Sequence, residues 1–256
     1  MRRLLYLTHR RRLPSTNRLL GLLLAFNAGA VNAGGFLVLQ MYTSHMTGFA
    51  SQVADSFVLG NMKLLLSAVG AIVAFLSGAA TCAVLVNWGR QHRLHSVYAL
   101  PLFLEAALML PFGLMGALTL TWGAPFAVPL TALLLAFTMG LQNAVASKTS
   151  GGSVRTTHMT GNITDLGIAL GKMLYWNRRG GLDGPQVRNS RERIRMAGGL
   201  LGMFVLGGIV GALGFSHFGF VCVVPLAAIL LALSVPPFLR DVSRSKEGLM
   251  RLLKIG

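Results

Sequence analysis

Two copies of one short motif are the residues of this sequence that could carry chemistry. His45-Met-Thr-Gly48 recurs as His158-Met-Thr-Gly161. A Thr hydroxyl can cap the start of a helix, and a glycine permits close approach of another group. We therefore expect Thr47 and Thr160 to be the N-caps of two short helices. The free N–H groups and positive dipole ends of such helices bind an anion or a polar ligand.

The motif also has a purely structural interpretation, which the sequence leaves open. Thr-Gly would let each segment pack against a face of small residues in the first apolar run, with each His bonded to a backbone carbonyl. The small residues of that face are Ala28, Gly29, Ala33 and Gly34. Under this interpretation the motifs bind nothing.

Other polar residues occur within or beside apolar runs, where polar side chains are costly and often functional. The further candidates for ligand hydrogen bonds are Asn32, Gln142, Asn143 and Asn162. The candidates for proton or ion coupling are Asp55, Glu105 and Asp165. The alternatives are that Asp55 and Asp165 only reach headgroups or water, and that Glu105 forms a structural hydrogen bond.

Signals of a metal site or of catalysis are weak. The sequence has no CxxC, no Gly-rich phosphate loop and no catalytic Ser/His/Asp arrangement. Its 12 methionines are better explained by apolar packing than by copper binding. We therefore expect no cofactor, no metal and no enzymatic activity.

The elements that position these residues follow from composition. The 256 residues are 54% hydrophobic and 12% charged, with a mean hydropathy of +0.63. A soluble domain is about 25% charged, so a soluble enzyme and a disordered chain are both excluded. Cys82 and Cys222 both lie in apolar runs, which excludes a disulfide-stapled secreted domain.

Six apolar runs have the roughly 20 residues that a membrane-spanning helix needs. They are Leu19–Met41, Leu64–Trp88, Val97–Leu120, Phe126–Ser147, Met196–Phe215 and Phe218–Leu239. Two segments that contain the motifs, Ser44–Gly60 and Thr157–Leu174, are shorter and more polar. The sequence thus predicts an all-α membrane protein with six transmembrane helices and two re-entrant, interfacial or half-length segments.

The charge distribution supports six crossings. The net charge of +16 and the pI near 11.5 are also typical of nucleic-acid binders. If the two weak segments do not cross, every Lys and Arg except Lys63 lies on the cytoplasmic side. If they do cross, the basic clusters at 89–96 and 148–156 lie outside, against the positive-inside rule. We therefore expect cytoplasmic termini, and basic loops that contact anionic lipid headgroups, not nucleic acid.

The chain carries signs of an internal duplication. Leu22-Leu-Leu-Ala-Phe26 recurs 111 residues later as Leu133-Leu-Leu-Ala-Phe137. Asn32 recurs at the same spacing as Asn143. The predicted units are a basic tail (1–18), two repeats (19–120 and 121–239) and a second basic tail (240–256). Because each repeat crosses three times, the second is expected to be inverted relative to the first.

The residues around these motifs carry a resemblance to a known group. Gly29-Ala-Val-Asn32, Gly140-Leu-Gln-Asn143 and the two HMTG motifs resemble the YoaK-like family of bacterial inner-membrane proteins of unknown function. The resemblance covers about Leu19 to Leu239 and implies a multispanning inner-membrane protein. In the family pattern an Asp stands at the position of Asn32 and an Asn at that of Phe49.

The two motif segments are expected to meet at a central polar site that passes a small polar or anionic solute, as in a secondary transporter or a channel. The alternative is a scaffold or accessory subunit that transports nothing. An enzyme acting on lipid would need its histidines at one interface, whereas these are expected to approach from opposite sides. Gly198/Gly202 and Gly207/Gly211 predict tight helix packing within one subunit or in a homo-oligomer.

Overall fold

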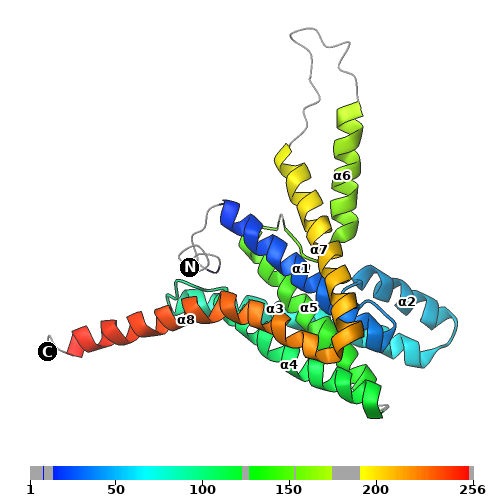
Figure 1. Cartoon of the computed structure of the whole chain (residues 1–256), viewed down its shortest axis with the longest axis horizontal. Helices are drawn as coiled ribbons and strands as arrows, with labels where there is room; N and C mark the ends of the chain where they lie inside the picture. The colour runs from blue at the N-terminus through cyan, green and yellow to red at the C-terminus, as the bar shows by residue number, and fades with distance from the viewer. Residues whose placement is uncertain (1–7, 9–13, 123–126, 153, 175–190, 254–256) are drawn as a thin grey trace, which may run out of the picture.

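The computed structural model describes residue 8 and residues 14–122, 127–152, 154–174 and 191–253. Parts of both predicted basic tails, and most of the basic loop before Arg191, lie outside these residues. The helices are α1 (Pro14–Leu39), α2 (Met46–Val58), α3 (Met62–Gln91), α4 (Ala99–Trp122), α5 (Ala127–Ser150), α6 (Met159–Leu174), α7 (Arg191–Phe218), the short 3-10 helix η2 (Gly219–Cys222) and α8 (Val223–Leu253). The described part of the chain contains no strand, so the all-α prediction is confirmed (Figure 1).

Five helical stretches are long and apolar enough to cross a membrane. They are Thr16–Leu37, Met62–Gln91, Ala99–Leu118, Pro129–Ser150 and Arg191–Asp241. The first four correspond to the first four predicted spans. The last, 51 residues long, contains both remaining predicted spans. The 3-10 helix η2 separates α7 from α8 within it and lies near the start of the sixth predicted span.

The two motif segments form the short helices α2 and α6, of 13 and 16 residues. At about 1.5 Å per residue, each is too short to cross a hydrocarbon core of about 30 Å. α2 packs against α3, and α6 lies along α7 (Figure 1). Both keep apolar side chains such as Phe57 and Leu170 exposed, as a helix in contact with lipid does.

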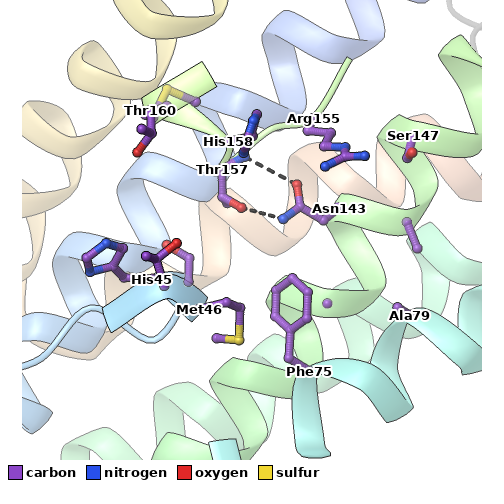
Figure 2. Close-up of a pocket in the computed structure, with 15 residues that line it drawn as sticks. His45, Met46, Phe75, Ala79, Asn143, Ser147, Arg155, Thr157, His158 and Thr160 are labelled. Carbon is purple, nitrogen blue, oxygen red and sulfur yellow. Dashed lines mark hydrogen bonds between the residues drawn. The ribbon is translucent and has the colours of Figure 1, made fainter. Parts of the chain in front are cut away.

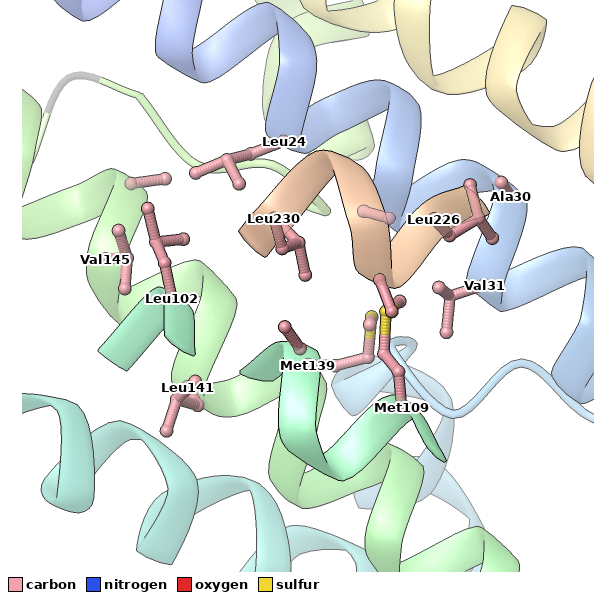
Figure 3. Close-up of a cluster of buried hydrophobic side chains, with 14 of the residues drawn as sticks. Leu24, Ala30, Val31, Leu102, Met109, Met139, Leu141, Val145, Leu226 and Leu230 are labelled. Atoms are coloured by element: carbon pink, nitrogen blue, oxygen red, sulfur yellow. The ribbon is translucent and has the colours of Figure 1, made fainter. Parts of the chain in front are cut away.

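The helices at the centre of the bundle are α1 and α5. Of their most apolar windows, 67% and 61% are buried, against 22% for α3. Leu24, Met109, Met139 and Leu230, one each from α1, α4, α5 and α8, are almost fully buried in one cluster (Figure 3). The main helix pairs are α1 with α7, α3 with α5 and α4 with α8. α3 therefore presents much of its surface to lipid.

Glycines set the closest helix crossings. A Cβ added at Gly78 of α3 would collide with the Phe137 carbonyl of α5, and one added at Gly140 would collide with the Phe75 carbonyl of α3. Because each glycine is the third residue after a phenylalanine, the crossing is a reciprocal contact between two Phe-x-x-Gly segments. Small residues allow such close backbone approach in membranes.

The same contact recurs between α1 and α7. A Cβ at Gly29 would meet the Phe204 carbonyl, and a Cβ at Gly207 the Phe26 carbonyl. Gly211 likewise lies against Ala30, so the predicted Gly207/Gly211 face packs within the chain. By contrast, a Cβ at Gly202 has no described atom within 4 Å.

Several chain segments that carry basic residues meet at one end of the bundle, around Tyr98. Its backbone N–H donates to the Thr8 carbonyl at 3.4 Å, and its hydroxyl donates to the Lys148 carbonyl at 3.1 Å. Arg90 Nη2 donates to the same hydroxyl at 3.4 Å. Thr8, the end of α3, the start of α4 and the end of α5 therefore lie together.

The C-terminal helix joins this end through Asp241. Its buried carboxylate accepts from the Ser96 backbone N–H at 2.7 Å and lies 3.5 Å from His95 Nδ1. Four parts of the chain that are distant in sequence, at Thr8, residues 90–98, Lys148 and Asp241, are thus held at one face of the bundle, and each lies in or next to one of the predicted basic regions.

The glycine crossings predict a specific stability effect. Gly78→Ala should lower the free energy of unfolding by about 1–3 kcal/mol or more, because the added methyl group forces the α3 and α5 backbones apart. Gly202→Ala is the matched control, since its methyl group meets no described atom, and it should leave stability equal or slightly higher. Thermal unfolding of the detergent-solubilised variants measures both. Equal melting temperatures would contradict the close crossing.

Candidate functional site

The first motif is held beside α1 by a hydrogen bond. After α1 ends at Leu39, the chain turns through Gln40, which has a positive φ of 52°. Ser44 Oγ then donates to Asn32 Oδ1 at 3.2 Å. Asn32 lies seven residues before the end of α1, a rise of about 10 Å. The chain has therefore returned along the helix when it reaches His45.

The second motif is held in the same way beside α5. Asn143 Oδ1 accepts from Thr156 Oγ1 at 3.1 Å. It also accepts from the Thr157 backbone N–H at 3.3 Å, while Asn143 Nδ2 donates to Thr157 Oγ1 (Figure 2). Asn143 is again seven residues before its helix ends, at Ser150. Gly151 and Gly152, both with positive φ, make the turn. Both motifs thus begin beside the interior of a long helix.

These contacts give the two asparagines a positioning role. Asn32 and Asn143 are candidates for ligand hydrogen bonds, and in the structure their side-chain amides hold the returning chain. Asn143 also lines the cavity described next, whereas Asn32, which is 7% exposed, does not. Sequence reasoning missed the hydroxyl residue directly before each His, Ser44 or Thr157, although the two residues stand at the same position relative to the motif in both copies.

Both motifs line one cavity of about 410 Å³. The other walls come from α3, α5 and the loop before α6 (Figure 2). The lining residues are Ser44, His45, Met46, Thr47, Phe75, Ala79, Gly140, Asn143, Ala144, Ser147, Arg155, Thr157, His158, Met159 and Thr160. The two copies of the motif, which are 113 residues apart in sequence, therefore face the same space.

The helix starts at the cavity differ from the sequence prediction. The N-cap of α2 is His45, which makes no side-chain capping hydrogen bond. α6 begins at Met159, so Thr160 lies inside its first turn, as Thr47 lies inside that of α2. The prediction that the threonines are N-caps is therefore wrong, because the helices begin before them.

The motif glycines make room for the histidines. A Cβ at Gly48 would lie 2.7 Å from His45 Nδ1, and a Cβ at Gly161 would collide with the His158 ring. In each copy the imidazole folds over the first turn of its own helix, where any larger residue at the fourth motif position would displace it. Both histidines are exposed and line the cavity.

The remaining predicted residues lie away from the cavity lining. Asn162 Nδ2 contacts the Met159 sulfur at 3.8 Å. Asp55 is exposed on α2, and Asp165 is half-buried on α6. Glu105 and Gln142 are fully buried inside the bundle. The structure thus brings together the motif residues and Asn143, and leaves the three carboxylates elsewhere.

Arg155 is a cavity residue that the sequence analysis counted only as part of a basic loop. It lies three residues before His158, is exposed, and lines the cavity. Among the cavity-lining residues that the structure describes, none is acidic. The charge at this site is therefore positive. In the described residues, no three His, Cys, Asp or Glu side chains lie together so as to hold a metal ion.

A bundle of long apolar helices with much lipid-facing surface defines an integral membrane protein that crosses the bilayer several times. Residues 20–235 match the family described as "Protein of unknown function (DUF1275)", and the chain belongs to this family. The YoaK-like resemblance is thereby confirmed. Comparison with curated proteins, and with solved structures, finds no match.

The hydrogen bonds of Asn143 lead to a testable expectation. Asn143→Ala removes three hydrogen bonds to the loop before α6, and should cost about 1–3 kcal/mol of stability. It should also speed trypsin cleavage after Arg155 in the detergent-solubilised protein, because the loop loses its attachment to α5. Asn162→Ala, which loses only a weak contact to sulfur, is the control. Unchanged cleavage in Asn143→Ala would contradict the positioning role.

Proposed function

We propose that this protein is a secondary transporter or channel for a small anionic or polar solute, which binds in the cavity between the two HMTG motifs. The observation that carries the proposal is that both motif copies line one cavity of about 410 Å³. Ligand pockets for small molecules fall in this size range, about 300–1,000 Å³. A motif that only packed helices together would not need to face a shared space.

The electrostatics of the cavity favour an anion. The first turns of α2 and α6 line it, and helix N-termini carry partial positive charge and free N–H groups. Arg155 adds a full positive charge, and the exposed imidazoles of His45 and His158 add hydrogen-bond donors. Discontinuous helices whose N-termini point at an anionic group recur at the substrate sites of transporters.

We further propose that α1–α4 and α5–α8 are two inverted repeats. The pairing of α1 with α7 and of α3 with α5 supports this, since each joins the first helix of one repeat to the third of the other. The reciprocal Phe-x-x-Gly contacts occur in both pairs. The asparagine seven residues before the helix end also occurs in both halves.

The proposed topology has six crossings, in a bacterial inner membrane, with both termini in the cytoplasm. The meeting of the N-terminal region, residues 90–98, Lys148 and Asp241 at one end of the bundle supports it. Eight crossings would place the start of the chain and residues 90–98 on opposite sides. With six crossings, the two motifs enter the site from opposite faces of the membrane, as alternating access requires.

Transport is tested with purified protein in liposomes. Anion flux should be measured as currents after concentration jumps of acetate, nitrate, sulfate and phosphate. Arg155→Gln, and the double variant His45→Ala/His158→Ala, should lower the flux by about tenfold or more, equivalent to about 1.4 kcal/mol of lost anion stabilisation.

Arg93→Gln is the matched control for Arg155→Gln. Arg93 is an exposed arginine at the same end of the bundle but outside the cavity lining, so its loss should leave flux unchanged. If the wild-type protein conducts no more than empty liposomes, the transport proposal fails, and the accessory-subunit alternative takes its place.

Cysteine labelling tests the topology. In a background with Cys82 and Cys222 replaced by Ala, Lys63→Cys should react with an impermeant maleimide added outside intact cells. Arg93→Cys should react only after the membrane is opened. Labelling of position 63 only from the cytoplasm would exclude the inverted arrangement.

A further inference from the structure

A second polar cluster lies inside the bundle, separate from the lining of the cavity. It consists of Asn27 of α1, Glu105 of α4 and Gln142 of α5, each with 0% of its surface exposed. Asn27 Nδ2 donates to Glu105 Oε1 at 3.4 Å, and Gln142 lies beside the same carboxyl group. Three helices thus contribute one polar side chain each to one buried point.

Most of the polar atoms in this cluster have no protein partner. Asn27 Oδ1, Glu105 Oε2 and both amide atoms of Gln142 are buried without a hydrogen bond. Buried polar side chains normally have a partner, and each exception calls for an explanation. Here three of the four atoms are oxygens that can accept a bond or coordinate a cation.

The charge of the cluster is also unbalanced. A carboxylate inside a bilayer-spanning bundle is very unfavourable without a compensating positive charge. In the described residues, the ion pair that the structure shows joins His95 to Asp241 at the end of the bundle, and no Lys or Arg pairs with Glu105. The described residues therefore supply no compensating charge for Glu105.

We propose that Asn27, Glu105 and Gln142 bind one monovalent metal cation, with Na⁺ as the probe ion. Hard cations of this kind prefer carboxylate and amide oxygens. A metal ion can coordinate Asn27 Oδ1, Glu105 Oε2 and Gln142 Oε1 together, whereas a proton on Glu105 satisfies only its own oxygen and one acceptor. A single carboxylate neutralises one positive charge, which favours a monovalent over a divalent ion.

The cation site adjoins the solute cavity through α5. Gln142 belongs to the buried cluster, and the next residue, Asn143, lines the cavity and holds the loop before the second motif. An ion that pulls Gln142 toward Glu105 therefore acts on the helix turn that positions the motif. The cation is thereby the coupling ion of transport. This coupling role rests on the proposed function, whereas the existence of the cation site does not depend on it.

Cation binding is tested without any solute. The melting temperature of the detergent-solubilised protein should rise by about 3 °C or more when choline chloride is replaced by NaCl at a constant ionic strength of about 150 mM. Glu105→Gln, which keeps the shape but removes the charge, should lose this rise, as should Gln142→Met. Glu192→Gln, which neutralises an exposed carboxylate on α7, should keep it.

Binding of ²²Na⁺ to the wild-type protein gives a second measurement that does not depend on the folding of a variant. Saturable binding at about one ion per chain supports the site, given the single carboxylate. No saturable binding, or an equal Na⁺ effect in Glu105→Gln, overturns it. A melting temperature that responds to pH but not to Na⁺ also overturns it, in favour of a protonated Glu105. Na⁺ binding without anion flux would retain the site and reject only the transport function.

Discussion

The hydrogen bond between an asparagine inside a long helix and a hydroxyl residue just before the HMTG motif is the contact on which the site depends. Asn32 forms it with Ser44, and Asn143 forms it with Thr157. Each asparagine lies seven residues before its helix ends, so the chain must return by about 10 Å along the helix to reach it. The short helices consequently start beside the interior of a long helix, at the cavity, and the free backbone N–H groups of a helix start favour an anion.

The glycine crossings make this arrangement compact and also form part of the cavity wall. Gly140 packs against the Phe75 carbonyl, and both residues line the cavity. The tightest contact between α3 and α5 therefore lies directly beside the cavity. A change in the angle of this crossing would alter the cavity. Gln142, which belongs to the buried cluster around Glu105, lies two residues after Gly140 on the same helix. The helix packing, the proposed solute site and the proposed cation site thus share one turn of α5.

Much of the fold follows from the sequence, because a membrane-spanning helix must be long and apolar and this pattern is visible in one dimension. The first four predicted spans match α1, α3, α4 and α5, and the motif segments form helices too short to cross. The site was harder to predict. Thr47 and Thr160 suggested N-caps, but the helices begin earlier, since Gly48 and Gly161 let each histidine ring fold over the first turn. Arg155 carried no signal beyond its charge.

By itself, the sequence determined the membrane class, the approximate spans, the duplicated motif and its family, since these depend on composition, run length and repetition along the chain. Only the tertiary structure decided that both motifs face one cavity, that Asn32 and Asn143 position the chain, and that Asn27 and Gln142 meet Glu105. These are contacts between helices distant in sequence. They depend on crossing points set by backbone contacts at glycines, and a pattern of apolar residues carries no information about which helix lies opposite each glycine.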